Sequence, residues 1–348
     1  MSTDLKLRSS KVAIVSDIHG GVHRNSQSWY TILMDWCGWF KQECIDNDIK
    51  DIIIPGDIFH HRHEVNVHTM NIVYDMFKML ECFNVIVTIG NHDAYYKNTS
   101  EIHSLVFLKD WENVSIIDTT TTITAFDSVI TFCPWGVDMD KVPQSDIIFG
   151  HFELKGFNMA AHKICAHGLP AGNVLEKAPL VFTGHFHLRD ERTYQTGTII
   201  YVGSAYEQTW GDAGSTKGYY TLDINTKEYQ FTRNNISPKH VKVHLSNILK
   251  HGVSDKDKKD FKSNWIKLVI DVKISPDNID VLVTKLNTLQ PLSLHIEYQC
   301  ESVIDVDTDY EFKGVDIGDC IHEYIDLLAI DNKKDVSDRM LDLYRRVG

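Results

Sequence analysis

The sequence predicts a layered α/β domain followed by a smaller second unit, and two patterns indicate this. Short apolar runs of four to six residues recur between Lys11 and His187. Between them lie segments with apolar residues at three- and four-residue steps, which is the pattern of amphipathic helices. Strands that alternate with such helices form a sheet covered by helices.

Five of the apolar runs end in Asp, Asn or His. In chain order they are KVAIVSDIHGG from position 11, DIIIPGDIFHH from 51, NVIVTIGNHDAYY from 84, DIIFGHFELKG from 146 and PLVFTGHFHLRD from 179. Ligands of open α/β sheets bind at the carboxyl ends of strands, so we expect these polar residues to converge. They are Asp17, His19, Asp57, His60, Asn91, His92, Asp93, His151, His185 and His187.

Two helical stripes separate the first three runs, and we expect both to cover the sheet. The first contains Trp29, Leu33, Trp36, Cys37 and Phe40, and the second contains Met70, Val73, Tyr74, Phe77 and Leu80. After the last motif, the segments KGYYTLDI and EYQFTR are strand-like, so we place the end of the first domain near residue 236.

A second unit, residues 237–300, has a βαβ-like pattern. Strands are predicted at Lys239–Leu245, WIKLVIDVKI and LSLHIEYQ, with a charged loop or short helix in GVSDKDKKDFKSN. Ser275 and Pro276 have the N-cap and first-turn positions of a helix. The tail, residues 301–348, has two short helical stripes, one at Ile321, Tyr324, Ile325 and Leu328 and one at Val336, Met340, Leu343 and Val347. With little core of their own to join, these helices suggest a partner.

Composition places the chain among soluble globular proteins, because 43% of its 348 residues are hydrophobic and 24% charged. No apolar run approaches a membrane span, and the polar N-terminus lacks the apolar stretch of a signal peptide. Its seven cysteines are scattered and never spaced as C-x-x-C. They favour reduced thiols and a cytoplasmic location over a disulfide framework or a zinc ribbon.

The net charge of −13 argues at first against a nucleic-acid partner. Residues 300–348 account for −7 of it, with 13 acidic and 6 basic residues, which leaves −6 for residues 1–299. Several of those carboxylates belong to the strand ends, where bound cations would offset them. The acidity is therefore concentrated in the tail.

The residue types at the strand ends suit a borderline cation such as manganese or iron. A structural zinc would favour cysteines, and calcium or magnesium would favour oxygen ligands alone. The candidates Asp17, His19, Asp57, Asn91, His151, His185 and His187 are too many for one ion. Two ions bridged by one carboxylate would use them all, and paired metals of this kind catalyse phosphoester hydrolysis.

The motifs DIHG, GDIFH, GNHD, GHFE and GHFH, in this order, resemble those of the calcineurin-like metallophosphoesterases. The resemblance implies a four-layered α/β/β/α sandwich. It also implies that His92 protonates the leaving oxygen or orients the phosphate, with Asp93 orienting His92 and Gly90 permitting a tight turn. One metal would be held by Asp17, His19, Asp57 and His187, and the other by Asp57, Asn91, His151 and His185.

The form GDIFH is similar to the nuclease branch of this superfamily, the SbcD and meiotic-recombination-eleven double-strand-break repair nucleases, in which the histidine at the position of His60 contacts phosphate. GHFELKGF, YVGSAYEQTWGD and the tail extend the resemblance over nearly the whole chain, most closely to phage recombination endonuclease subunits. One departure is that DIHGG lacks the leucine that this branch commonly has between His and Gly.

The resemblance implies a Mn²⁺-dependent 3′-to-5′ DNA exonuclease with endonuclease activity, with Mg²⁺ or Fe²⁺ as alternative metals. Residues 1–236 would form the nuclease domain, residues 237–300 a DNA-binding cap, and residues 301–348 a tail that binds an SbcC-like SMC-type ATPase. Double-stranded ends and single-stranded DNA are the expected substrates, a homodimer the expected assembly, and the host cytoplasm the location if a phage encodes the chain. The alternatives are a small-molecule phosphodiesterase, a phosphoprotein phosphatase, or a DNA-end-binding scaffold with weak catalysis.

Overall fold

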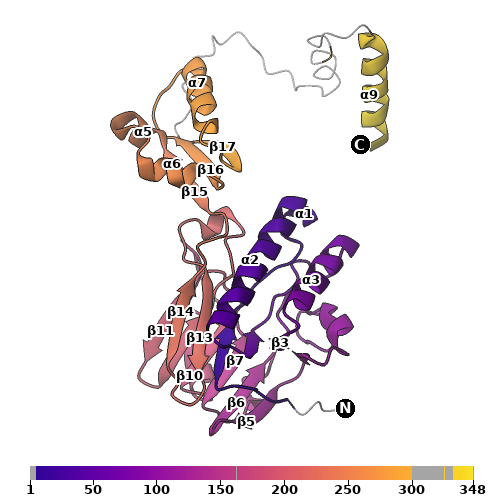
Figure 1. The fold of residues 1–348 in the computed structure, drawn as a ribbon, viewed down its shortest axis with the longest axis vertical. Coiled ribbons are helices and arrows are strands. Elements are labelled where there is room, and N and C mark those ends of the chain that lie inside the picture. The colour runs from indigo at the N-terminus through magenta and orange to yellow at the C-terminus, as the bar shows by residue number, and fades with distance from the viewer. Residues whose placement is uncertain (1–4, 162, 300–324, 326–331, 348) are drawn as a thin grey trace. The chain divides into compact units, whose positions relative to one another are not determined.

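Two six-stranded mixed sheets form the large α/β part of the protein (Figure 1). The computed structural model describes residues 5–161, 163–299, 325 and 332–347. In the first sheet, four consecutive strands run parallel up to one edge, and at the other side two further strands are each antiparallel to the strand before. Its spatial order is β14 (Tyr229–Arg233), β13 (Gly218–Asp223), β1 (Lys11–Ile14), β2 (Asp51–Ile54), β3 (Asn84–Thr88) and β4 (Val114–Ile117).

The second sheet has four parallel central strands with an antiparallel strand at each edge. Its order is β11 (Asp190–Tyr194), β12 (Gly197–Tyr201), β10 (Leu180–Gly184), β7 (Ile147–His151), β6 (Ser128–Cys133) and β5 (Thr121–Ala125). The parallel strands β1, β2, β3, β7 and β10 are almost entirely buried, as expected for strands covered on both faces.

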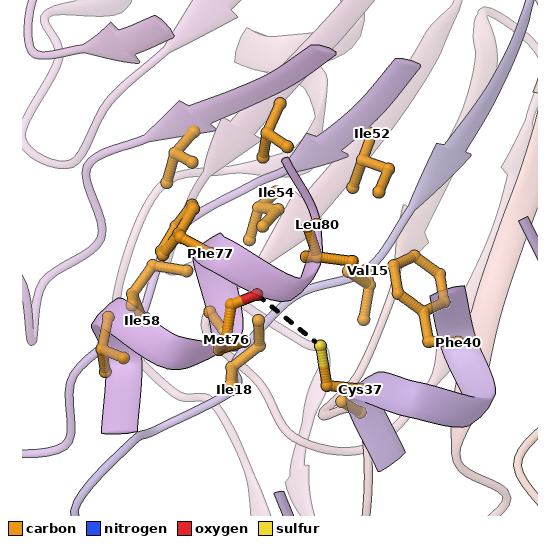
Figure 2. Close-up of a cluster of buried hydrophobic side chains, with 14 of the residues drawn as sticks. Val15, Ile18, Cys37, Phe40, Ile52, Ile54, Ile58, Met76, Phe77 and Leu80 are labelled. Atoms are coloured by element: carbon orange, nitrogen blue, oxygen red, sulfur yellow. Dashed lines mark hydrogen bonds between the residues drawn. The ribbon is translucent and has the colours of Figure 1, made fainter. Parts of the chain in front are cut away.

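Helices α2 (Gln27–Asp46) and α3 (Val67–Met79) cover the outer face of the first sheet (Figure 1). Their apolar faces pack on alternate residues of β1, β2 and β3, as Figure 2 shows for Phe40, Phe77 and Ile54. Cys37 Sγ lies 3.8 Å from the carbonyl oxygen of Met76 and joins the two helices. The predicted stripes are buried except for Met70, which is half-buried, and Tyr74, which is 45% exposed because the buried face of α3 is centred on Ile72, Val73 and Met76.

The two sheets pack face to face through a second apolar cluster, which includes Ile14, Ile53, Phe149 and Phe182. A third cluster on the outer face of the second sheet is covered by the short helix α4 (Ala171–Leu175) and by loops. The predicted α/β/β/α sandwich is confirmed, with a thin fourth layer. Short elements complete this part: α1 (Val22–Asn25), η1 (Ser104–Leu108), η2 (Met139–Lys141), β8 (Asn158–Ala160), β9 (Lys163–Ile164) and η3 (Trp210–Asp212).

A three-stranded sheet with three helices follows β14, and we call residues 237–299 the basic module. The predicted strands and the helix behind Ser275 are present, and the charged segment is helical, with a capping box between Ser254 and Asp257. Its elements are β15 (His240–His244), α5 (Leu245–His251), α6 (Asp255–Phe261), β16 (Trp265–Ile270), α7 (Pro276–Asn287) and β17 (Ser293–Tyr298).

The second predicted tail stripe lies on α9 (Lys333–Val347), whereas the first, apart from Ile325, lies outside the described residues. The contacts of the chain divide it into two compact units, Met1–Ile270 with Ile274–Glu297, and Asp271–Lys273 with Tyr298–Gly348. The three-domain division stays a prediction. Among the described residues, no helix has both the length and the apolar character needed to span a membrane.

Candidate metal centre

The polar residues at the strand ends converge where β1, β2 and β3 of one sheet meet β7 and β10 of the other. Three groups of side chains place their ligand atoms within 4.8 Å of one another. They are Asp17, His19 and His187; Asp57, His151 and His185; and His19, His60 and His92.

We call Asp17, His19, Asp57 and His187 the first cluster. His19 Nε2 lies 2.9 Å from His187 Nε2, 3.6 Å from Asp57 Oδ2 and 4.0 Å from Asp17 Oδ1. Ligand atoms about 2.1 Å from an ion at octahedral angles lie about 3 Å from one another. The nitrogen–nitrogen distance is therefore that of neighbouring ligands of one ion.

We call Asp57, Asn91, His151 and His185 the second cluster. Asn91 Oδ1 lies 2.9 Å from His151 Nε2 and 2.7 Å from His185 Nδ1. His151 Nε2 lies 3.4 Å from Asp57 Oδ2, the oxygen that also faces His19. One carboxylate oxygen thus borders both clusters.

Backbone groups of neighbouring motifs orient these ligands. The N–H of His185 donates to Asp17 Oδ1 at 3.0 Å, and the N–H of His92 donates to Asp57 Oδ1 at 2.8 Å. The second bond leaves Oδ2 of Asp57 directed at the clusters. His151 Nδ1 lies 2.7 Å from the carbonyl oxygen of Pro55, so Nδ1 carries a proton and Nε2 faces the second cluster.

The backbone at the clusters is strained. Asp17, His19, Asp57 and His185 have φ values of 54°, 51°, 57° and 97°, a region that non-glycine residues rarely occupy. Gly90 is required for a different reason from the predicted tight turn. A Cβ on Gly90 would lie 2.2 Å from Asp57 Oδ1, so only glycine lets the third motif approach the second.

Burial controls the protonation of the clusters. It lowers the pKa of His185 to about 3 and that of His187 to about 4, so both rings are neutral at pH 7 and can bind a cation. Burial also raises the pKa of Asp17 to about 7. Burial opposes ionisation of Asp57 too, but the adjacent His151 outweighs it and holds the pKa of Asp57 well below its usual range.

His92 and His60 lie beside the first cluster, with ring centroids 4.9 Å and 5.4 Å from that of His19. The structure shows other contacts for Asp93 than the predicted one with His92. Both carboxylate oxygens of Asp93 accept backbone N–H groups, those of Asp57, Ile58, Phe59 and Gly90, at 2.9 to 3.1 Å. The ring of His92 is held instead by the carbonyl oxygen of His60, 2.6 Å from Nδ1. His61, His63 and His68, which follow the second motif, are exposed.

The structure adds residues that the motifs did not indicate. Gln208 Nε2 donates to the carbonyl oxygen of Asp17 at 2.7 Å, and Lys217 Nζ donates to that of His187 at 2.6 Å. Arg62 Nε donates to the carbonyl oxygen of Asn91 at 2.8 Å. Trp135 lies 5.1 Å from the ring of His185. The sequence held a signal for two of these residues: Trp135 follows the apolar run SVITFC as the other site residues follow theirs, and Gln208 lies in the segment YVGSAYEQTWGD that carries part of the resemblance.

The two clusters fit a dinuclear metal site. Two carboxylates and four imidazoles are gathered in a buried space, and His19 Nδ1 is a buried nitrogen with no hydrogen-bond partner. Such a group of charges and lone pairs is costly to bury unless cations bind it. The mixture of oxygen and nitrogen ligands matches a transition metal better than magnesium or calcium.

A family model described as calcineurin-like phosphoesterase matches residues 10–189. Among solved structures, one from a study of a novel archaeal phosphodiesterase is 18% identical, covers 64% of this chain and 99% of its own, and has a TM-score of 0.38. A likeness at this level says nothing about the substrate of this chain. No curated protein matches the sequence.

Proposed function

The chain belongs to the calcineurin-like phosphoesterase family, and we propose that it is a Mn²⁺-dependent DNA nuclease with 3′-to-5′ exonuclease and endonuclease activity. The observation that carries the proposal is the combination of a two-cluster metal site with a basic module in an acidic protein. Residues 237–299 have ten lysines against seven Asp and Glu residues, a net charge of +3 in a chain of −13. A module of net positive charge in a phosphoesterase favours a polyanionic substrate.

In this proposal each cluster holds one ion, and Asp57 is shared. Bound metals would supply an activated water and offset charge on the phosphate. His92 has its Nδ1 fixed by the carbonyl oxygen of His60, so Nε2 is free to give a proton to the leaving oxygen. His60 contacts the phosphate, and Asp93 positions the loop that carries Asp57.

A basic cavity supports DNA as the substrate. It has a volume of about 950 Å³ and is lined by residues of the basic module and of the loops around η3. Its cationic lining residues are Lys163, Arg233, Lys239, Lys242 and Lys256. Lysines and arginines arranged in this way neutralise phosphates without reading sequence, as a nuclease of broad specificity requires.

We further propose an SbcC-like ATPase as partner of the tail and a homodimer as the assembly, on the basis of the motif resemblance. Helix α9 supports a docking role because Met340 on it is 42% exposed. Ile45 on α2 and Tyr74 on α3 are also exposed apolar residues, 48% and 45% exposed, on the helical layer where the resemblance places the dimer contact.

The experiment that tests the nuclease function is incubation of the purified protein with end-labelled duplex and single-stranded DNA, alone and with its ATPase. Cleavage should appear with Mn²⁺, be weaker with Mg²⁺ alone and vanish in chelator, because imidazole-rich sites bind magnesium poorly. Asp57→Asn should abolish cleavage and lower metal occupancy.

Two outcomes would contradict the proposal. Cleavage that persists in chelator would exclude the two-metal mechanism. Hydrolysis of bis(p-nitrophenyl) phosphate without cleavage of any DNA would identify a small-molecule phosphodiesterase instead.

A further inference from the structure

We call the edge of the two sheets that carries the first and second clusters the metal edge. Trp135 lies at this edge and contributes to none of the three apolar clusters of the described residues. It follows β6, and its backbone N–H donates to the carbonyl oxygen of Ile89, just past the end of β3. The indole Nε1 donates to the carbonyl oxygen of Lys97 at 2.8 Å, which fixes the ring. The indole of Trp135 is therefore half-buried, oriented by a hydrogen bond, and not part of these apolar clusters, so its ring can serve as a contact surface for a ligand.

The indole lies against the second cluster. Its ring is 5.1 Å from that of His185 at an interplanar angle of 33°, and 5.9 Å from that of His151. A ligand in contact with Trp135 would therefore lie next to an ion or phosphate held by the second cluster.

A cavity of about 410 Å³ opens at this point, within the range of about 300 to 1,000 Å³ that small-molecule sites occupy. Trp135 and His151 line it, together with the exposed Lys97. Two of its lining segments are in close contact at Gly136 and Asn98. Gly136 has a φ of 79°, and a Cβ on it would lie 3.0 Å from the carbonyl oxygen of Asn98. We call this space the Trp135 cavity.

We propose that the Trp135 cavity binds the nucleobase next to the phosphate at the metal edge, with the indole as the stacking surface and Lys97 as a contact for the adjoining phosphate. The inference rests on the proposed nuclease function and specifies how the substrate is held. Every base presents a π face, so stacking on an aromatic side chain tolerates any sequence. An aromatic surface, one cation and a metal-bound phosphate match one nucleotide unit of a single strand.

The test compares Trp135→Ala and Trp135→Phe with wild type, and Tyr194→Ala is the matched control. Tyr194 is an exposed aromatic residue at the opposite edge of the second sheet, because it pairs with Gly197 at the start of β12. Calorimetry with Mn²⁺ present measures the affinity for thymidine 5′-monophosphate and, as a base-free probe, for inorganic phosphate.

Trp135→Ala should weaken binding of the nucleotide about tenfold, within the span known for loss of a base–aromatic stack, and leave the affinities for phosphate and Mn²⁺ unchanged. Trp135→Phe should retain most of the affinity, and Tyr194→Ala all of it. Equal losses for nucleotide and phosphate would overturn the inference, because Trp135 would then act only by supporting His185.

Cleavage gives an independent measurement. Wild type should cut a single strand with an intact base at the scissile position about tenfold faster than one with an abasic residue there, and Trp135→Ala should lose this preference. DNA cleavage with the preference intact in Trp135→Ala would overturn the cavity assignment alone. If wild type cut no DNA, the nuclease proposal would fail, whereas selective loss of nucleotide binding in Trp135→Ala would still support the cavity as a nucleotide site.

Discussion

Replacement of Asp93 by Asn should destabilise the protein and weaken its metal site together. The Asp93 side chain is 1% exposed, and Oδ2 accepts the N–H groups of Asp57 and Gly90 while Oδ1 accepts those of Ile58 and Phe59. Asparagine retains one oxygen and replaces the other with an NH₂ group. Whichever way the amide turns, two buried N–H groups face a donor instead of an acceptor.

The size of the destabilisation follows from the two N–H groups that lose their acceptor. A buried donor without a partner costs about 1 to 3 kcal/mol, so the free energy of unfolding should fall by about 2 to 6 kcal/mol. One of the two pairs includes Asp57 N–H, at a residue held at a φ of 57°. Affinity for Mn²⁺ should therefore also fall, by about 10- to 100-fold, as for other residues that orient a metal ligand.

Urea denaturation without metal would measure the first effect and Mn²⁺ calorimetry the second. The exposed Asp110, changed to Asn, is a matched control that should alter neither quantity. Wild-type stability and wild-type Mn²⁺ affinity in Asp93→Asn would refute the assignment of Asp93 as the residue that positions the Asp57 loop. Reduced turnover with normal Mn²⁺ affinity would instead favour the orienting role toward His92 that the sequence predicted.

Three other changes test separate parts of the structure. His92→Gln should keep the metal stoichiometry of wild type and lower turnover about 10²-fold or more, the range for a lost general acid; metal loss with normal turnover per bound ion would place His92 among the ligands. Asp212→Asn removes the carboxylate 2.7 Å from the buried Lys217 Nζ and should cost about 3 to 5 kcal/mol at pH 7 in a urea titration. Burial opposes the charge of Asp212, but Lys217 outweighs it and holds the pKa of Asp212 below its usual 3.8. The difference in unfolding free energy between wild type and Asp212→Asn should therefore be complete above pH 3.8 and shrink below it. A constant difference down to pH 2 would contradict this. A chain that ends near Asp316 should keep its circular dichroism melt and Mn²⁺-dependent cleavage but lose co-purification with the ATPase, and undiminished binding would rule out the docking role of the tail.

The convergence of the strand-end residues could be predicted because it needs only the direction of the strands. The carboxyl ends of parallel strands share one edge, and β1, β2 and β3 pair parallel with one another. Asp17, Asp57 and Asn91 therefore had to meet, whatever the detailed register. The same reasoning extends to His151 and His185 on β7 and β10 of the other sheet.

Contacts between backbone groups could not be predicted in this way. Asp93 follows His92 in the chain, and adjacency suggested that the two side chains act together. The turn at Gly90 instead directs the Asp93 carboxylate toward four N–H groups, three of them more than thirty residues away in sequence. The motif GNHD contains Gly90, His92 and Asp93 but says nothing about which of its side chains faces the backbone of another motif.

The loop from Glu207 to Lys217 contacts both the metal clusters and the basic module, and its first half belongs to the segment YVGSAYEQTWGD that carries part of the resemblance. On one side Gln208 and Lys217 hold the backbone of metal-edge residues. On the other, the Glu207 carboxylate accepts the N–H of His240 at 2.5 Å, and the Trp210 ring packs on His240 with Lys267 Nζ 4.7 Å above it.

Both sets of contacts share one short backbone, so we expect the metal site and the basic module to be energetically coupled. In the proposed nuclease, a substitution in the loop should therefore alter metal affinity and DNA affinity together, and neither effect alone can be assigned to a single function. Substitutions that separate the effects on metal and on DNA must lie outside the loop, one in the basic module and one beside the metal clusters. Lys242 lines the basic cavity and His92 lies beside the first cluster, so Lys242→Met should change the salt dependence of DNA binding and His92→Gln the rate of cleavage, each without the other.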